Sequence, residues 1–258
     1  MLLSPMFRSF DLRRSALPGD RPLESGETGS LDACRAALAP FEVSLPASVL
    51  ASGPAAAWVR GHHWSVDART VPDWDLAVRA RIDPNLVTLH CTTVEPRHIS
   101  QITREAVGRL AAGTLAEIDA IRPRADGRAH HLLLRICDVA GDGFTVGSTA
   151  ADRATEAIVR QRYSCMVGLY CAIGWGVSDA VSVPAAIGDA IAQMEHIHHR
   201  FGVVLTRLHL GGTHLGAASE EARRRFAADI GDSLEDACAA MRFPRPDVTV
   251  SIPSGGVA

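Results

Sequence analysis

Four side chains that can exchange protons or neutralise anions lie near the ends of apolar, strand-like runs of the sequence. Asp67, His90 and His209 are titratable, and Arg135 is a permanent cation. A carboxylate beside imidazoles can act as a general acid and base, and a guanidinium stabilises developing negative charge. Because the carboxyl ends of parallel strands meet at one edge, we expect these side chains to lie close together. These four residues are our candidate catalytic residues.

Two segments that combine glycine with a hydroxyl residue follow the last two strand-like runs. Their residues are Gly211, Gly212, Thr213, Ser254, Gly255 and Gly256. Glycine allows backbone N–H groups to approach an anion closely, and the hydroxyls add further donors. The alternative is that both segments are ordinary tight turns. Their place after two neighbouring strands favours a site for a phosphorylated small molecule.

Cysteines and histidines near the same strand ends raise the question of a metal site. Imidazole, thiolate and carboxylate groups bind zinc, but no pair has the spacing typical of a zinc site on one element. Glu-x-x-His motifs start at Glu95 and at Glu195, but a di-iron bundle also requires inward-facing glutamates from two further helices. Buried cysteines and hydrogen-bonded histidines explain these residues better. We therefore expect no metal.

Eight short apolar runs alternate with stretches of helical periodicity, and these elements must position the candidate residues. The expected strands span residues 41–45, 64–68, 86–91, 113–115, 131–137, 165–173, 203–210 and 248–252. Most are continuous apolar runs, which is typical of a parallel sheet buried on both faces. Eight such units predict a single-domain α/β fold, a (β/α)8 TIM-like barrel over residues 31–258, after a polar leader at 1–30. A doubly wound open sheet is the alternative.

Composition and charge exclude several classes of protein. The chain has 258 residues, 47% of them hydrophobic, and a formal net charge of −3. This balance gives no basic face for nucleic acid. No apolar run reaches the ~18 residues that a membrane-spanning helix needs. Six scattered cysteines without a CxxC pair indicate reduced thiols, so we expect a cytoplasmic protein with no nucleic-acid or membrane partner.

The chain contains no lysine, so all 26 of its basic residues are arginine. The bias of a GC-rich genome towards arginine explains much of this count. Its chemical consequence is nevertheless definite, because a guanidinium stays protonated and cannot replace an amine. A side-chain Schiff base, a lysine general base and a phosphate-binding lysine are all excluded.

Several strand-end sequences resemble, in order, the barrel domain of the fold-type III pyridoxal-phosphate decarboxylases. This group contains the ornithine, diaminopimelate and arginine decarboxylases and shares its barrel with alanine racemase. The similar segments are residues 64–68, 133–136, 168–174, 208–212 and 252–255. The resemblance runs from about residue 41 to the C-terminus. It implies a TIM-like barrel that lacks the family's C-terminal β-domain.

The sequence departs from this family at the positions that hold its cofactor. The family's lysine, which binds pyridoxal phosphate, corresponds to Ser44, and its ring-stacking histidine corresponds to Ala172. The glutamate that pairs with the pyridine nitrogen corresponds to Ile252, and an aspartate corresponds to His209. The family's decarboxylation needs both the amine and the carboxylate. We therefore expect no covalently bound pyridoxal phosphate.

The resemblance therefore implies a non-catalytic homologue, or pseudoenzyme, of the amino-acid decarboxylases. It would bind a phosphorylated small molecule without a covalent bond, or regulate a partner protein. By analogy with the family's dimers it would form a homodimer, or a heterodimer with a related protein. The alternative is an enzyme of a different class that uses the four candidate catalytic residues at the C-terminal face, with or without a metal. A third reading is an interaction module whose cofactor space is filled by Trp175 and Ile252.

Overall fold

The computed structural model of the chain describes residues 25–137, 143–173, 182–211, 215 and 218–252. Eight strands form one closed sheet in which each strand runs parallel to both neighbours. They are β1 (Glu42–Pro46), β2 (Ser65–Ala68), β3 (Val87–His90), β4 (Arg109–Ala112), β5 (His130–Ile136), β6 (Ser164–Ala172), β7 (Arg207–Gly211) and β8 (Asp247–Ser251). The pairing of β8 with β1 closes the barrel. The predicted (β/α)8 barrel is confirmed, and the open sheet is wrong.

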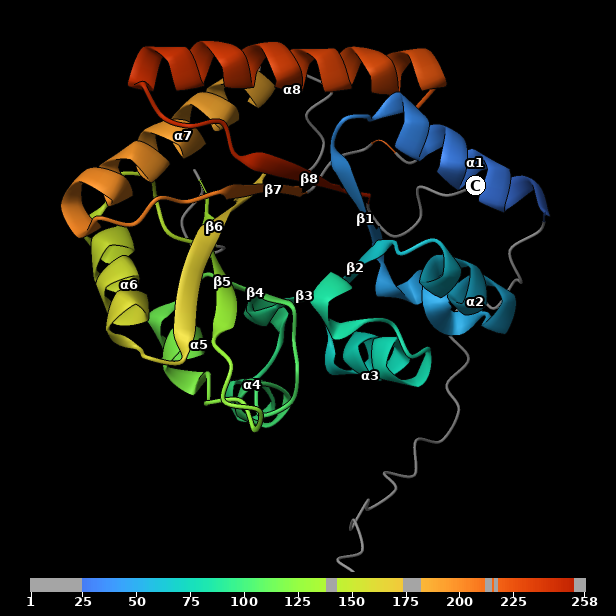
Figure 1. The fold of residues 1–258 in the computed structure, drawn as a ribbon, viewed down its shortest axis with the longest axis horizontal. Coiled ribbons are helices and arrows are strands. Elements are labelled where there is room, and N and C mark those ends of the chain that lie inside the picture. The colour runs from blue at the N-terminus through green and yellow to red at the C-terminus, as the bar shows by residue number, and fades with distance from the viewer. Residues whose placement is uncertain (1–24, 138–142, 174–181, 212–214, 216–217, 253–258) are drawn as a thin grey trace, which may run out of the picture.

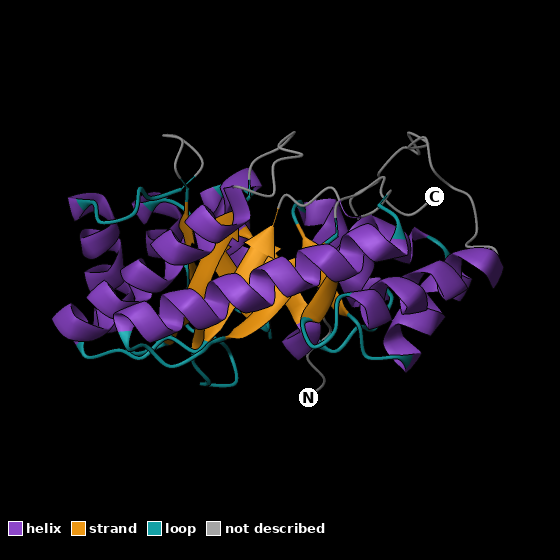
Figure 2. Cartoon of the chain, turned by 90° about the horizontal axis from the view of Figure 1, so that it is seen from above, coloured by secondary structure: helices purple, strands orange, loops and turns teal. Residues whose placement is uncertain are grey.

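Helices surround the barrel and cover its outer face (Figure 1 and Figure 2). They are α1 (Ser25–Ala37), α2 (Gly53–Gly61), α3 (Val71–Arg79), α4 (Pro96–Ile102), α5 (Leu115–Ala120), α6 (Thr149–Arg160), α7 (Ser182–Phe201) and α8 (Glu220–Met241). Short 3₁₀ helices follow β1 and β3 and precede β3, at η1 (Ala47–Ala51), η3 (Cys91–Thr93) and η2 (Pro84–Leu86). Within the described ranges, no helix is long and apolar enough to cross a membrane.

Hydroxyl side chains begin several of the helices that follow strands. Thr70, Ser148 and Ser219 each accept a hydrogen bond from the backbone N–H three residues later. Thr70 also forms a reciprocal capping box with Asp73. A cap of this kind stabilises a helix start by about 1 kcal/mol. These caps therefore fix the points at which the chain turns from the barrel into its outer helices.

The fourth strand begins earlier in the sequence than predicted. It spans Arg109–Ala112, whereas residues 113–115 were expected to form it. The Thr114 hydroxyl accepts from the Glu117 backbone N–H, and the Glu117 carboxylate accepts from the Gly113 N–H. Residues 113–115 therefore belong to the start of α5, because a hydroxyl residue followed by an acid favours a helix start over a strand interior.

Helix α1 begins at Ser25, so the last residues of the segment expected to be a polar leader are helical. Its apolar side chains Leu31, Cys34 and Ala37 lie three residues apart and are buried, so one face of this helix packs against the core. Strand β7 begins only at Arg207, so residues 203–206 precede the barrel wall.

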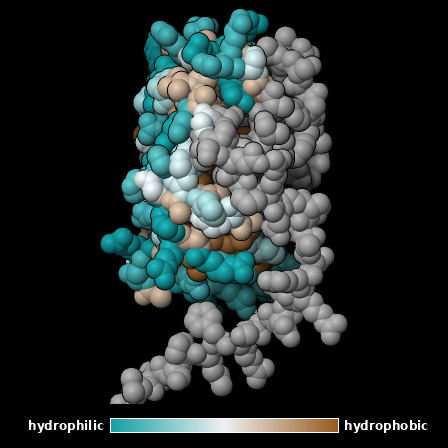
Figure 3. All heavy atoms as spheres, turned by 90° about the vertical axis from the view of Figure 1, so that its right-hand side faces the viewer, coloured by the Kyte–Doolittle hydropathy of each residue, from teal (hydrophilic) through white to brown (hydrophobic). Residues whose placement is uncertain are grey.

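The main hydrophobic core lies between the strands and the helices. Outward-facing strand residues such as Val43, Leu89 and Leu110 are almost completely buried there. The solvent side of the helices is mainly hydrophilic, as Figure 3 shows for one face. Inside the barrel, a separate and much smaller apolar cluster contains Ala111 and Leu133 beside Tyr170. Branched apolar residues usually fill such barrels, so the polar interior points to a functional site.

Candidate functional site

Side chains at the amino ends of the strands form an ion-pair network inside the barrel. Arg109 donates to both carboxylate oxygens of Glu42, at 3.0 and 3.3 Å, and also to the Thr88 hydroxyl at 3.1 Å. Ser65 and Thr249 donate to the same carboxylate. Burial raises the pKa of Glu42, but Arg109 and the hydroxyls outweigh it and lower this pKa to about 2. This network fills the end of the barrel that is usually structural.

At the carboxyl ends of the strands, four buried side chains converge on Asp67, which is itself buried. Ser44 donates to its Oδ1 at 2.9 Å, and Ser251 donates to its Oδ2. His90 Nε2 lies 3.4 Å and His209 Nε2 lies 3.6 Å from Oδ1. His209 Nε2 is also 2.6 Å from Ser251 Oγ. Each of the five residues is at most 2% exposed, and we call this group the Asp67 cluster.

The protonation states within the Asp67 cluster follow from its contacts. Burial raises the pKa of Asp67, but His209 and His90 outweigh it and hold this pKa well below its usual value. Burial lowers the pKa of His90, although Asp67 opposes the shift. Asp67 is therefore an ionised carboxylate that can only accept hydrogen bonds. Ser251 uses its one hydroxyl hydrogen to donate to Asp67. His209 Nε2 must then carry a proton, which it donates to Ser251.

The Asp67 cluster differs from the Ser–His–Asp triad of hydrolases. In that triad, one ring nitrogen of the histidine faces the serine and the other faces the aspartate. Here Ser251 and Asp67 both face Nε2 of His209. Its Nδ1 has no hydrogen-bond partner among the residues that the structure describes. The arrangement therefore does not prepare Ser251 for nucleophilic attack through His209.

Tyr170 connects the Asp67 cluster to an arginine on β5. Its ring centroid lies 4.9 Å from that of His90 and 5.2 Å from that of His209. The guanidinium carbon of Arg135 lies 4.9 Å from the Tyr170 centroid, which is a cation–π contact. A Cβ atom at Gly211 would lie 1.8 Å from the Tyr170 hydroxyl oxygen. Glycine at this position therefore makes room for the phenol.

This barrel also matches a known family in sequence. The family model described as the pyridoxal-binding domain of pyridoxal-dependent decarboxylases matches residues 64–257. The chain belongs to this family. A search of curated proteins finds no match.

Solved decarboxylase structures share the fold of this family member. Diaminopimelate decarboxylase from M. jannaschii, in complex with L-lysine, is 13% identical with a TM-score of 0.74, over 87% of this chain and 58% of that one. Lysine/ornithine decarboxylase from Vibrio vulnificus, complexed with cadaverine, is 16% identical with a TM-score of 0.71; the match covers 87% of this chain and 60% of that one. Lysine decarboxylase from Selenomonas ruminantium is 15% identical with a TM-score of 0.68; the match covers 87% of this chain and 58% of that one. The chain thus spans less than two thirds of these decarboxylases.

The family's cofactor, pyridoxal phosphate, can be tested against the residues of this barrel. Covalent attachment requires an amine, and the 258 residues contain no lysine. On β1, the inward residue nearest Asp67 is Ser44, whose hydroxyl donates a hydrogen bond to Asp67. The residues present therefore do not fit a covalently held cofactor.

The structure brings together most of the candidate catalytic residues of this decarboxylase-family barrel. Asp67, His90 and His209 meet in the Asp67 cluster, and Arg135 joins it through Tyr170. Sequence reasoning missed Ser251 and Tyr170. Strand register was the missing signal, because Ser251 pairs with Ser44, and Tyr170 pairs with His209.

The remaining predicted site residues lie beside the cluster or outside the described ranges. Ala172 packs against the inner apolar cluster and pairs with Gly211. Ile252 is buried in the larger core with Val248 and Val250, so Ser251 is the polar residue at this end of β8. The residues outside the described ranges are Trp175, Gly212, Thr213, Ser254, Gly255 and Gly256. The phosphate site therefore stays a prediction.

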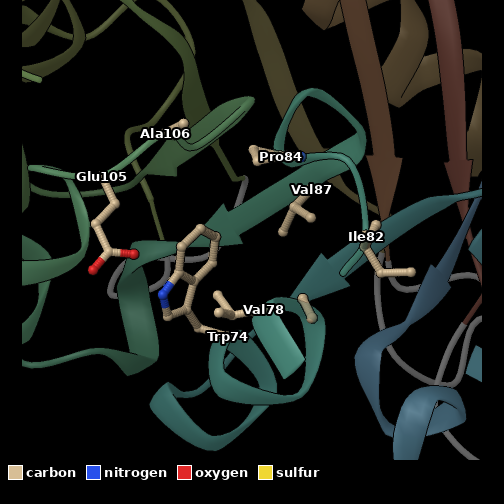
Figure 4. Close-up of a pocket in the computed structure, with 8 residues that line it drawn as sticks. Trp74, Val78, Ile82, Pro84, Val87, Glu105 and Ala106 are labelled. Carbon is tan, nitrogen blue, oxygen red and sulfur yellow. The ribbon is translucent and has the colours of Figure 1, made fainter. Parts of the chain in front are cut away.

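The described residues contain other chemical groups and cavities outside this cluster. No set of three or more histidines, cysteines or acids among them is arranged to hold a metal ion. The six cysteines form no disulfide within the described part of the chain, and burial raises the pKa of Cys91. An apolar pocket of about 230 Å³ lies near the amino ends of β3 and β4, with Trp74 and Val78 on one side and Glu105 on another (Figure 4). It lies at the other end of the barrel from the Asp67 cluster.

Proposed function

We propose that this chain is a non-catalytic member of the pyridoxal-dependent decarboxylase family. The observation that carries the proposal is Ser44, which lies inside the barrel and donates to Asp67. In the resemblance to the family, Ser44 occupies the place of the cofactor-binding lysine. No other residue of the chain supplies a side-chain amine. The barrel therefore keeps the family's fold without its means of attaching the cofactor.

Two further positions support the loss of the family's reaction. Decarboxylation on the cofactor needs a carboxylate that keeps the pyridine ring protonated. At the end of β8, the family's glutamate corresponds to Ile252, and the neighbouring inward side chain is the hydroxyl of Ser251. The family's stacking histidine corresponds to Ala172. A single reverted residue would therefore not rebuild the reaction.

Incubation with pyridoxal phosphate, reduction with borohydride and peptide mapping test this proposal. We expect no adduct on any internal residue, because the only primary amine of a lysine-free chain is its N-terminal amine. We also expect no release of carbon dioxide from lysine, ornithine or diaminopimelate. A stoichiometric internal adduct, or turnover that tracks the purified chain, would refute the proposal.

We further propose that the barrel binds a phosphorylated small molecule non-covalently at the glycine segments after β7 and β8. Gly211 is the described member of this set and lies buried at the carboxyl end of β7. Binding of inorganic phosphate or of pyridoxal phosphate is measured by calorimetry. Gly212→Val is expected to weaken this binding at least tenfold, because the valine side chain would block the approach of the anion to the backbone N–H groups. Equal affinity of the variant and the wild type would reject the glycine site.

A regulatory role through a partner protein belongs to the same proposal. The family analogy suggests a homodimer, or a heterodimer with a related decarboxylase. Sedimentation of the chain alone and of its mixture with such an enzyme tests this part. A monomer that leaves the enzyme's mass and activity unchanged would reject it.

An enzyme of a different class is the second candidate, and the convergence of Asp67, His90 and His209 favours it. A neutral imidazole beside a buried carboxylate is able to accept a proton from a bound molecule. Elemental analysis of the purified protein tests the metal-dependent form of this candidate. Stoichiometric zinc or iron would support that form, and a metal-free protein would remove it.

A further inference from the structure

A groove on the outside of the barrel is formed by the first half of α7 and the second half of α8. It has a volume of about 900 Å³. Its apolar lining includes Gly188 and Ala192 from α7, and Ala237, Ala240 and Met241 from α8. Met241 is 41% exposed, which is unusual for a large apolar side chain. The small residues between the two helices leave an open apolar channel, and such surfaces mark interaction sites.

The groove also carries unbalanced negative charge. The acidic residues that line it are Asp189, Asp229, Asp232 and Asp236. None of them forms an ion pair with another residue in the described part of the chain, and no basic side chain lines the groove. The glutamates at the start of α8, by contrast, pair with arginines one turn later. The groove therefore suits an apolar segment that carries arginines.

A second copy of the same groove is a poor occupant. In a symmetric dimer the same patch meets itself, so the aspartates of both copies would face one another. Like charges placed opposite each other oppose association. The occupant must instead bring positive charge to the groove.

We propose that the groove binds residues 1–14 of the same chain. Their sequence, MLLSPMFRSFDLRR, has seven apolar side chains, three arginines and one aspartate. Its apolar residues match the lining of the groove, and its excess of arginine matches the unpaired aspartates.

The connection to the barrel permits this contact. The segment precedes α1, which starts at Ser25 and packs against α8 (Figure 1). With residues 1–14 in the groove, residues 15–24 form the connection to α1. An extended chain spans at most ~3.5 Å per residue, so these ten residues reach up to about 35 Å. Helix α8, with its 22 residues, is only about 33 Å long. The segment can therefore reach the groove at the far end of α8.

Limited proteolysis of the full chain with trypsin tests this proposal. Bound arginines resist cleavage, so we expect slow cutting after Arg8, Arg13 and Arg14. The double variant Asp232→Asn/Asp236→Asn should be cut there about fivefold faster, which is the effect of two lost surface ion pairs. Asp75→Asn, an equally exposed aspartate on α3, is the matched control and should leave the rate unchanged. Equal rates in all three proteins would overturn the proposal.

Carbodiimide cross-linking gives a second and independent readout. It joins amines to carboxylates, and the only primary amine of this lysine-free chain is at its N-terminus. We expect one major linked peptide, between the first residues and the segment 229–236. A link to another helix would overturn the proposal. A link that forms only between copies, and increases with protein concentration, would assign the groove to a neighbouring molecule and overturn the intrachain contact.

Discussion

At the level of single residues, the Asp67 carboxylate organises the interior of the barrel. It accepts from Ser44 and Ser251 and lies close to His90 and His209, yet no arginine pairs with it among the described residues. A buried carboxylate without a permanent counter-ion depends on every hydrogen bond it receives. The cluster is therefore sensitive to the loss of any one member.

Replacement of this carboxylate by an amide should be costly. Asp67→Asn keeps the side-chain volume but replaces one carboxylate oxygen by an amide NH2 group. One of the two hydroxyl donors, Ser44 or Ser251, then loses its acceptor and faces another donor. We expect the free energy of unfolding at pH 7 to fall by about 3 kcal/mol. Urea unfolding measures this change, with the exposed Asp75→Asn as a control within about 0.5 kcal/mol of the wild type. An Asp67→Asn protein as stable as the control would contradict the geometry of the cluster.

The pKa shifts predict how stability depends on pH. The pKa of His90 is lower in the folded state, so protons bind the unfolded chain more readily and stability falls as the pH drops below about 6.5. The lowered pKa of Asp67 adds a second loss below about pH 4.

His90→Gln separates these two effects. We expect a smaller loss of unfolding free energy between pH 7 and 5 than in the wild type, with the loss below pH 4 retained. The unfolding free energy of the variant should still fall somewhat between pH 7 and 5, because burial also lowers the pKa of His130 and His131. Urea unfolding across this pH range gives both curves. Parallel curves from pH 7 to 5 would show that His90 stays charged in the folded protein.

The residue types explain how much of this site the sequence reveals. Asp67, His90 and His209 could be predicted as site residues, because acids and imidazoles are rare inside apolar strands. Ser251 and Tyr170 escaped notice because serine and tyrosine occur in many structural roles. Their inward orientation depends on strand register, which apolar runs alone do not specify.

At the level of the elements, the barrel depends on a close approach between β6 and β7. A Cβ atom at Gly168 would lie only 2.0 Å from the Arg207 carbonyl oxygen. The register between β5 and β6 shifts close to this glycine. The backbone on both sides is held by the sheet and cannot move aside easily.

Gly168→Ala should therefore destabilise the barrel by about 3 kcal/mol, the upper range for overpacking a core. Gly231→Ala is the matched control, because no atom lies within 4 Å of its added Cβ on α8. For Gly231→Ala we expect the free energy of unfolding to rise by about 0.5–1 kcal/mol, because alanine has a higher helix propensity than glycine. Thermal unfolding of both variants checks the contrast. A Gly168→Ala protein with wild-type stability would contradict the packing of β6 on β7.

The number and order of elements could be predicted from periodicity, but several boundaries could not. β4 contains Arg109, which faces into the barrel and interrupts the apolar pattern expected of a buried strand. Residues 113–115 look apolar enough for a strand, yet the hydrogen bonds of Thr114 start a helix. Boundaries depend on such individual bonds, whereas the barrel depends on the whole pattern.

At the level of the whole molecule, the chain has the family's fold but contains no lysine that could hold the family's cofactor covalently. The chain belongs to the decarboxylase family and forms its closed barrel, while it covers only 58–60% of the compared decarboxylases. Folding depends on apolar residues between strands and helices, which this chain retains. The family's reaction depends on a few interior residues, and these can change without loss of the barrel.

The most direct test of this account compares the wild type with Ser44→Lys after incubation with pyridoxal phosphate and borohydride. Arg79→Lys, which places an amine on the exposed side of α3, controls for surface modification. We predict a single stoichiometric adduct at position 44 of the Ser44→Lys variant, little modification of Arg79→Lys, and no internal adduct in the wild type. An internal adduct in the wild type, or equal labelling of the two variants, would contradict the account.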